Sequence, residues 1–165
     1  MPNTYTLISS VTVGAGGASS IDFTSIPATY TDLCLEFSTR NTADINTFTL
    51  YVNGNSSNQT AMRVMGTGSS AVSSTYTEVQ TNASGTTAST FANGQIYIPN
   101  YANTSNNKSI SMDIVSENNA AGAYATAEAW LWSSTSAITS LSIVGRAGGT
   151  IAQHSTAYLY GIKNS

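Results

Sequence analysis

Short segments in which apolar and polar residues alternate recur along the whole chain. In the segment GQIYIP at 94–99, Ile96 and Ile98 alternate with Gln95 and Tyr97. A spacing of two places the apolar side chains on one face of a β-strand, which is the pattern of a strand buried on one side. The same alternation occurs at residues 33–37, 48–52 and 110–114. Because turn residues separate these segments and no convincing helix is visible, the chain is predicted to be all-β.

The number and spacing of these segments predict an antiparallel β-sandwich, jelly-roll-like, with about nine or ten strands. A chain of 165 residues can bury roughly 70% of its unfolded surface without disulfides or metals. We therefore expect a single β-sandwich domain over residues 1–165. The last alternating segment, at 157–163, is predicted to pair inside a sheet.

Turn signals divide the predicted strands. Asn53-Gly54 and Asn93-Gly94 are predicted to be turns, because both residue types tolerate positive φ. Pro99 cannot donate a backbone hydrogen bond, so the strand before it is expected to end there or to lie at an edge. Residues 66–74 are predicted to form a loop, and residues 75–81 are an ambiguous strand.

Residues 122–133 combine a high alanine content with a clear period of two. The alanines fall on one parity, and Trp130 and Trp132 fall on the other. A period of two favours a strand over a helix, and the small alanine face would permit close approach of another layer. For the tryptophans three alternatives are open: burial in the core, a contact between subunits, or an exposed platform for a ligand such as a sugar.

The chain carries few charges, with 8% Asp, Glu, Lys and Arg against about 25% in an average protein. Ser and Thr number 49 and Asn 15, while the net charge is only −3. Disordered chains usually combine high net charge with few aromatic residues, and this chain has nine Tyr, four Phe and two Trp. We therefore predict a folded domain with a nearly neutral, hydroxyl-rich surface, which suits membership of an assembly because copies repel each other little.

The five cationic residues are scattered, so neighbours in sequence cannot form a basic patch. Phosphate-backbone binding depends on clustered cations, and nucleic acid is therefore not an expected partner. The N-terminal segment lacks the features of a secretory signal peptide, and no apolar run approaches the ~20 residues that span a bilayer. The expectation is a protein made in a cytoplasm and not anchored in a membrane. The single Cys34 excludes an intrachain disulfide and is expected to be a small buried side chain.

Catalytic chemistry is not visible in the sequence. The one histidine, His154, has no nucleophile motif around it and is expected in a loop or at a strand edge. A glycosidase would need two carboxylates within about 10 Å of each other in one cleft. The acids are few and scattered: Asp22, Asp32, Glu36, Asp44, Glu78, Asp113, Glu117 and Glu128. We therefore expect no enzymatic activity and no catalytic residue.

No Cys/His cluster and no acidic calcium-loop motif is present, so no metal site and no cofactor are expected. A calcium site built from loop carbonyls stays open as an alternative. The polar loop after Pro99 is rich in asparagine and, together with the two tryptophans, supplies the candidate interface or ligand-binding residues. These are Trp130, Trp132, Asn100, Tyr101 and Asn103.

Several segments together resemble a group of small structural proteins of tailed bacteriophages, especially phages of aquatic bacteria such as cyanobacteria. The segments are SSIDFTSIPATYTDLCLEFSTR at 19–40, LYVNG at 50–54, GQIYIPNYANTSNNKSI at 94–110, AITSLSI at 137–143 and TAYLYGI at 156–162. These motifs describe strands and turns, so the resemblance concerns fold and lineage. Residues 61–89 match no such motif, and variable loops or partner contacts are expected there.

The resemblance implies a β-sandwich protein of the virion, synthesised in the host cytoplasm, that functions by packing against symmetric copies. Because the chain has the length of one domain and no fibre shaft, the first expectation is a capsid decoration (cement) protein. It would bind the major capsid protein or other virion proteins and stabilise the shell, as a homo-oligomer such as a trimer. The alternative is a tail-associated module, such as a short fibre, tip or baseplate protein, that contacts a glycan on the host surface.

Overall fold

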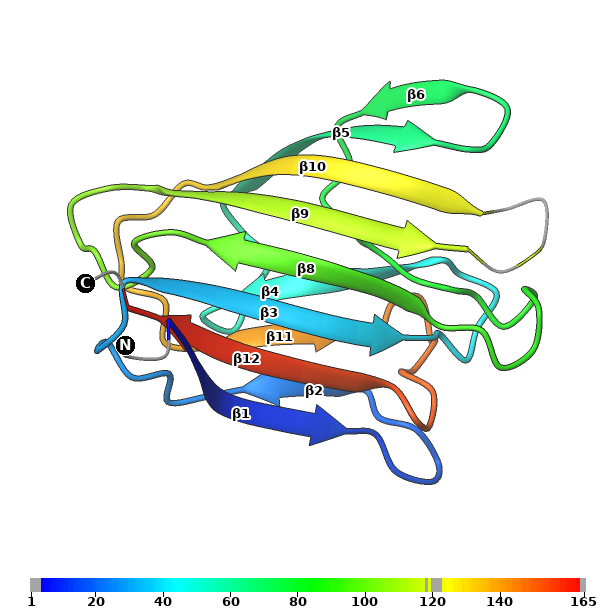
Figure 1. Ribbon diagram of the computed structural model, residues 1–165, viewed down its shortest axis with the longest axis horizontal. Helices are drawn as coiled ribbons and strands as arrows, with labels where there is room; N and C mark the ends of the chain where they lie inside the picture. Colours follow the sequence, from blue (N-terminus) through cyan, green and yellow to red (C-terminus); the bar gives the residue numbers. More distant parts are fainter. Residues whose placement is uncertain (1–3, 118, 120–122, 164–165) are drawn as a thin grey trace.

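The computed structural model of the protein describes residues 4–117, 119 and 123–163. All regular elements in this part of the chain are β-strands (Figure 1), so the all-β prediction is confirmed. In chain order they are β1 (Tyr5–Thr12), β2 (Ser20–Phe23), β3 (Asp32–Thr39), β4 (Thr47–Val52), β5 (Gln59–Gly66), β6 (Ala71–Ser74), β7 (Val79–Gln80), β8 (Ala92–Ile98), β9 (Lys108–Ser116), β10 (Tyr124–Trp132), β11 (Leu141–Val144) and β12 (Thr156–Ile162). Within the described ranges, no helix is long and apolar enough to cross a membrane.

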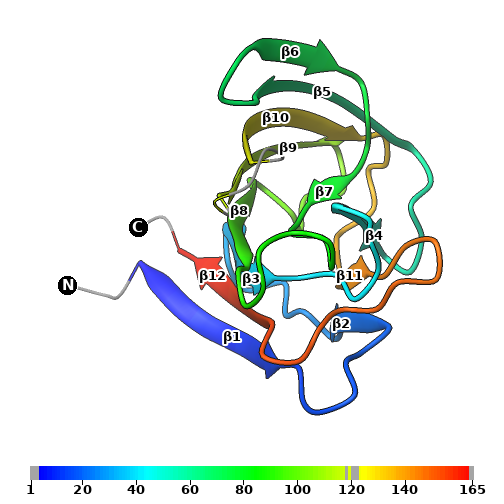
Figure 2. The same ribbon diagram turned by 90° about the vertical axis from the view of Figure 1, so that its right-hand side faces the viewer.

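The strands form two sheets that face each other (Figure 2). The larger sheet has eight strands in the order β1-β12-β3-β8-β9-β10-β5-β6, and the smaller has four in the order β2-β11-β4-β7. Every pair of neighbouring strands is antiparallel. The antiparallel β-sandwich is therefore confirmed, while the jelly-roll connectivity stays a prediction. The closing strand β12 lies between β1 and β3, as its sequence predicts.

The twelve strands exceed the predicted nine or ten partly because residues 66–81 contain more structure than expected. β6 lies in the predicted loop and pairs with β5, while β7 occupies two residues of the ambiguous segment and pairs with β4. None of the four residues of β6 is buried. Because β6 buries no apolar side chain, its sequence carries no alternation that could have revealed it.

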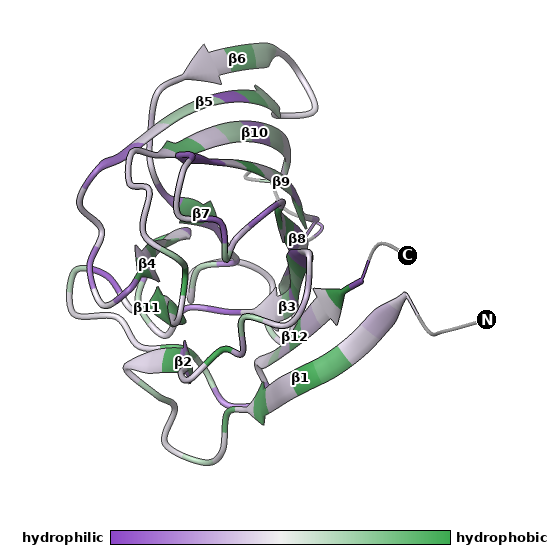
Figure 3. Cartoon of the chain, turned by 90° about the vertical axis from the view of Figure 1, so that its left-hand side faces the viewer, coloured by the Kyte–Doolittle hydropathy of each residue, from purple (hydrophilic) through white to green (hydrophobic). Residues whose placement is uncertain are grey.

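The core lies between the sheets, where the apolar half of the alternating segments in β3, β4, β8 and β9 points. Along β9, Ile110, Met112 and Ile114 are at most 2% exposed, whereas the residues between them are exposed. Figure 3 shows bands of different hydropathy along β5 and β10. In these two strands the alternation is reversed, because apolar residues such as Val64 and Ala127 are exposed and Arg63 and Glu128 are buried. The sheet therefore has an inner face, which packs on the small sheet, and an outer face, which points away from it.

The predicted turn at Asn93-Gly94 is wrong, because both residues lie inside β8. Gly94 is needed there for close packing: a Cβ atom at this position would lie 2.6 Å from Phe37 Cζ and 2.9 Å from Ile114 Cγ1. Asn53-Gly54 does form the predicted turn, with φ angles of 50° and 85°.

Candidate functional site

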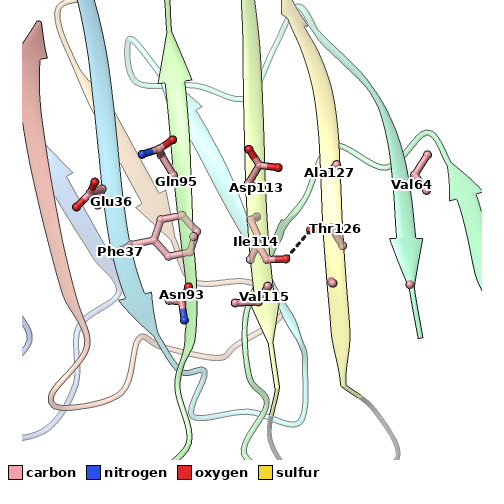
Figure 4. Close-up of a pocket in the computed structure, with 13 residues that line it drawn as sticks. Glu36, Phe37, Val64, Asn93, Gln95, Asp113, Ile114, Val115, Thr126 and Ala127 are labelled. Atoms are coloured by element: carbon pink, nitrogen blue, oxygen red, sulfur yellow. Dashed lines mark hydrogen bonds between the residues drawn. The ribbon is translucent and has the colours of Figure 1, made fainter. Parts of the chain in front are cut away.

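A hollow of about 770 Å³ lies on the outer face of the eight-stranded sheet. It extends over β3, β8, β9, β10 and β5, with Glu36 at one side and Val64 at the other (Figure 4). We call this hollow the outer groove. The side chains that give it its character are Glu36, Asn93, Gln95, Asp113, Val115 and Val64.

The register of the sheet sets the side chains of the outer groove in a row across the strands. Glu36 lies opposite Gln95, and Gln95 lies opposite Asp113. Asp113 lies opposite Ala127, which in turn lies opposite Val64. Neighbouring strands are about 4.8 Å apart, so the Cα atoms of Glu36 and Asp113 are separated by roughly 10 Å. The row thus passes from two carboxylates and an amide to apolar side chains.

The second half of the outer groove is apolar and has small side chains. Ala127 and Ala125 on β10 are exposed, and they lie opposite Val64 and Val115, which are 58% and 42% exposed. Met62, at 69% exposure, continues this surface into an adjoining hollow of about 410 Å³. The alanine face, which would permit close approach of another layer, faces outward in the described part of the chain.

The carboxylates of the outer groove have no cation beside them. Neither Glu36 nor Asp113 takes part in an ion pair or side-chain hydrogen bond within the described part of the chain. Arg40, which follows β3, is held by a loop instead. Its guanidinium donates at 2.9–3.1 Å to the backbone carbonyls of Ser84, Thr86, Thr87 and Thr90.

The other four cations lie away from the row of carboxylates. Arg63 on β5 is buried, where its Nε donates to Ser74 Oγ at 2.7 Å and its Nη1 to Gln80 Oε1 at 3.3 Å. Lys108 is buried between the sheets. The last two are Arg146, which forms an ion pair with Glu78, and Lys163, which lies near the ring of Tyr30. The outer groove is therefore acidic, although the net charge of the chain is small.

The structure places Trp130 and Trp132 in the core, at 2% and 5% exposure. Of the three alternatives for this pair, burial is the one observed, and an exposed tryptophan platform is excluded. The indole Nε1 of Trp130 donates to Glu128 Oε2 at 2.7 Å, while Glu128 Oε1 is buried without a hydrogen-bond partner. Burial raises the pKa of the Glu128 carboxyl, and the hydrogen bond from Trp130 opposes this shift.

Of the residues predicted to form an interface in the loop after β8, only some lie at the surface. Tyr101 is fully buried and donates its hydroxyl hydrogen bond to the carbonyl of Pro27, so its assignment to a surface site is corrected. Asn100 and Asn103 are exposed. Asn100 donates its backbone N–H to Asp32 Oδ1 at 2.9 Å. Neither asparagine lines the outer groove.

A buried ammonium holds this loop in place. Lys108 Nζ donates at 2.5–3.0 Å to four backbone carbonyls, those of Asn103, Asn106, Thr135 and Ser136. It also lies 5.8 Å from the centre of the Trp132 ring. Burial lowers the pKa of Lys108, and the four carbonyls favour its charged form. The two loops that flank β9 and β10 are thus tied together from within.

The carboxylates of the outer groove lie in a different environment from that of a glycosidase pair. Glu36 and Asp113 share one groove, but both are exposed, whereas a general acid in a glycosidase usually sits in an apolar environment. Glu128 has such an environment but faces the core. His154 lies exposed outside the strands, as predicted. Among the described residues, no group of three or more His, Cys, Asp or Glu could hold a metal ion.

Sequence reasoning did not single out Glu36, Gln95 or Asp113 as site residues. Each is a polar residue that stands between apolar residues in a strand that the alternation predicts. Their parity places them on an outer face, but only the pairing of β3 with β8 and of β8 with β9 brings them together. Comparisons of the chain with protein-family models, curated proteins and solved structures give no match.

Proposed function

We propose that this protein is a structural protein of a bacteriophage virion, a capsid decoration protein that docks through the outer face of its eight-stranded sheet. The observation that carries the proposal is the exposed apolar surface around the outer groove. Met62, Val64, Val115 and Leu131 are 39–69% exposed on neighbouring strands. Apolar side chains that gather on one face commonly mark a protein–protein contact.

The sequence resemblance to phage structural proteins supplies the biological setting of the proposal. In that setting the partner is the major capsid protein or another virion protein, and the chain acts as a homo-oligomer, for example a trimer. The protein is made in the host cytoplasm and resides in the virion. Its role is to bury surface at a junction in the shell, and catalysis has no part in it.

We also infer a jelly-roll connectivity from the strand order. The first four strands alternate between the two sheets, and β1 lies beside β12. Four strands of the large sheet, β1-β12-β3-β8, face the small sheet β2-β11-β4-β7. Of the remaining strands of the large sheet, β9 also contacts β7, and β10, β5 and β6 extend the sheet beyond it. Strands β9, β10 and β5 line much of the outer groove.

Copy number in purified phage particles tests the proposal. We expect quantitative mass spectrometry to find the protein in numbers comparable to the major capsid protein. A few dozen copies or fewer would contradict the decoration role and favour a tail or vertex position. Absence from the particle would contradict any virion role.

A second candidate function is a tail-associated module that binds a host glycan. Burial of the two tryptophans removes the platform first considered for this role. The outer groove nevertheless offers Asn93, Gln95, Glu36 and Asp113 as partners for sugar hydroxyls, and Tyr158, which is 38% exposed, lies opposite Glu36. Glycan-array binding that is lost in a Gln95→Ala variant would favour this function.

A further inference from the structure

We propose that the outer groove binds a basic segment of the partner protein, with an arginine or lysine side chain lying along Glu36, Gln95 and Asp113. The inference rests on the proposed docking role of the outer face and names the chemistry of what docks there. Three properties of the groove support it: its uncompensated charge, its apolar half and the spacing of its polar groups.

The charge of the groove is the first argument. Glu36 and Asp113 are exposed, unpaired within the described chain, and flank Gln95 on the neighbouring strand. All five cations of the chain point elsewhere, and two of them, Arg63 and Lys108, are buried. Since like charges on one face cost free energy unless a partner compensates them, the groove favours a ligand that brings positive charge.

The apolar half of the groove is the second argument. Ala127 and Val64 continue the row of polar groups without a gap, and Val115 lies beside the row on β9, two residues from Asp113. Arginine and lysine carry long aliphatic stems that pack on apolar surfaces while the head group contacts polar atoms. The alanines leave room for such a stem and for an apolar neighbour in the bound segment. The volume of about 770 Å³ suits a short peptide segment.

The spacing of the polar groups is the third argument. The Cα atoms of Glu36 and Asp113 are roughly 10 Å apart, with Gln95 between them. A divalent metal ion needs oxygen ligands that converge to about 2.0–2.6 Å from one point, and two carboxylates on alternate strands do not provide that. A guanidinium has five N–H donors in a wide planar group. It can therefore contact a carboxylate and the amide oxygen together.

The first test is binding of short peptides to the isolated protein. One peptide alternates leucine with arginine, a second replaces each arginine by glutamate, and a third probe is a neutral oligosaccharide. We expect fluorescence anisotropy to detect the arginine peptide alone. Raising the salt concentration from roughly 0.05 M to 0.5 M should weaken its binding about tenfold, because screening shortens the range of exposed charge interactions.

Variants then locate the binding site. The double variant Glu36→Gln, Asp113→Asn should weaken binding of the arginine peptide about tenfold, and Ala127→Trp, which fills the hollow, should abolish it. Asp22→Asn on β2 of the small sheet removes an exposed acid far from the groove and should leave the affinity unchanged. Thermal unfolding of each variant confirms that the fold is retained, because all four positions are exposed.

Three results would overturn the inference: no binding of the arginine peptide, equal binding in the double variant, or equal binding of the glutamate peptide. Binding of the oligosaccharide alone would overturn it in favour of the glycan function. These results are separable from the proposed function. A protein abundant in virions that does not bind the arginine peptide retains the docking role with a different partner chemistry, whereas peptide binding by a protein absent from virions refutes the virion role only.

Discussion

The two faces of β10 differ in the size and exposure of their side chains, although their residues alternate along one strand. On the inner face, Glu128, Trp130 and Trp132 are at most 5% exposed. On the outer face, Ala127 and Ala129 are exposed and line the two hollows of the large sheet. The inner face fixes the fold, whereas the outer face leaves a hollow that another molecule can fill.

Charge divides between the same two sides of the sheet. Lys108 and Arg63 lie on the inner side, where Lys108 donates to backbone carbonyls and Arg63, which lies opposite Glu128, donates to Ser74 and Gln80. Glu36 and Asp113 lie on the outer side without a cation. Burying cations therefore makes the outer face more acidic than the net charge of −3 suggests. Composition predicts a neutral surface, but the local potential follows from where each charge points.

The largest expected effect is the loss of stability when a side chain on the inner face, rather than on the outer face, is removed. Trp130→Ala removes a buried aromatic side chain and the hydrogen-bond donor to Glu128, so it should lower the free energy of unfolding by about 4 kcal/mol. Leu131→Ala, at the next position on the outer face, should lower it by less than about 1 kcal/mol. Urea unfolding of both variants measures the difference. Equal losses would show that the outer face is as important to the fold as the inner one.

The buried ammonium comes next. Lys108→Met keeps the apolar stem but leaves four carbonyls without their donor, and we expect a loss of about 3 kcal/mol in the free energy of unfolding. Ser109→Ala, on the outer face of the same strand, is the matched control and should change it by less than about 0.5 kcal/mol. If Lys108→Met is as stable as the parent protein, the four hydrogen bonds do not stabilise the loops.

A smaller effect concerns Glu128 and pH. Its folded-state pKa is raised above the unfolded value near 4.5, so its contribution to stability is full below that pH and is lost as the pH rises through the folded pKa. Glu128→Gln still offers an oxygen to Trp130 and carries no charge. We expect it to stabilise the protein by about 1 kcal/mol at pH 7 and to flatten the pH dependence above pH 4.5.

The control for this experiment is Asp113→Asn, which removes an exposed carboxylate from the outer face. Urea unfolding at pH 7 should give this variant a free energy of unfolding within about 0.5 kcal/mol of that of the parent protein. A Glu128→Gln protein that is less stable than the parent at pH 7 would mean that the buried carboxylate is better satisfied than its unpartnered Oε1 indicates.

The smallest expected effect tests how open the outer face is beside the groove. Cys34 has the same strand parity as Glu36, yet it is fully buried, and it lies opposite Tyr97 and Tyr160. Burial, with a smaller contribution from Glu36, raises the pKa of its thiol to about 11. We expect no alkylation by iodoacetamide at pH 8 in the native protein and complete reaction in urea. Rapid native reaction would show that this part of the face opens.

The sequence predicts the strands well where one face is apolar, as in β3, β8 and β9, because burial on one side imposes a period of two. It does not predict β6, which buries nothing. It misplaces a turn at Asn93-Gly94 because the reason for that glycine is a contact with Phe37 from another strand. The intrinsic preferences of neighbouring residues in the sequence carry no information about such tertiary contacts.

The candidate site was less predictable than the fold for the same reason. Alternation separates Trp130 from the alanines of β10 but does not say which face is covered. In the loop after β8, Tyr101 turns inward and donates its hydroxyl hydrogen bond to the carbonyl of Pro27, while Asn100 stays exposed. The outer groove requires the order of five strands, and no single segment encodes that order.

Oxidation of Met62 tests the central claim that the outer face is a docking surface. Met62 is 69% exposed beside the outer groove, whereas Met112 on the inner face is 1% exposed and serves as the internal reference. Mass spectrometry after brief peroxide treatment compares the free protein with purified particles that contain it. We predict that Met62 oxidises readily in the free protein and is strongly protected in the particle. Equal oxidation of Met62 in both states would contradict the account, because the outer face would then remain uncovered in the assembly.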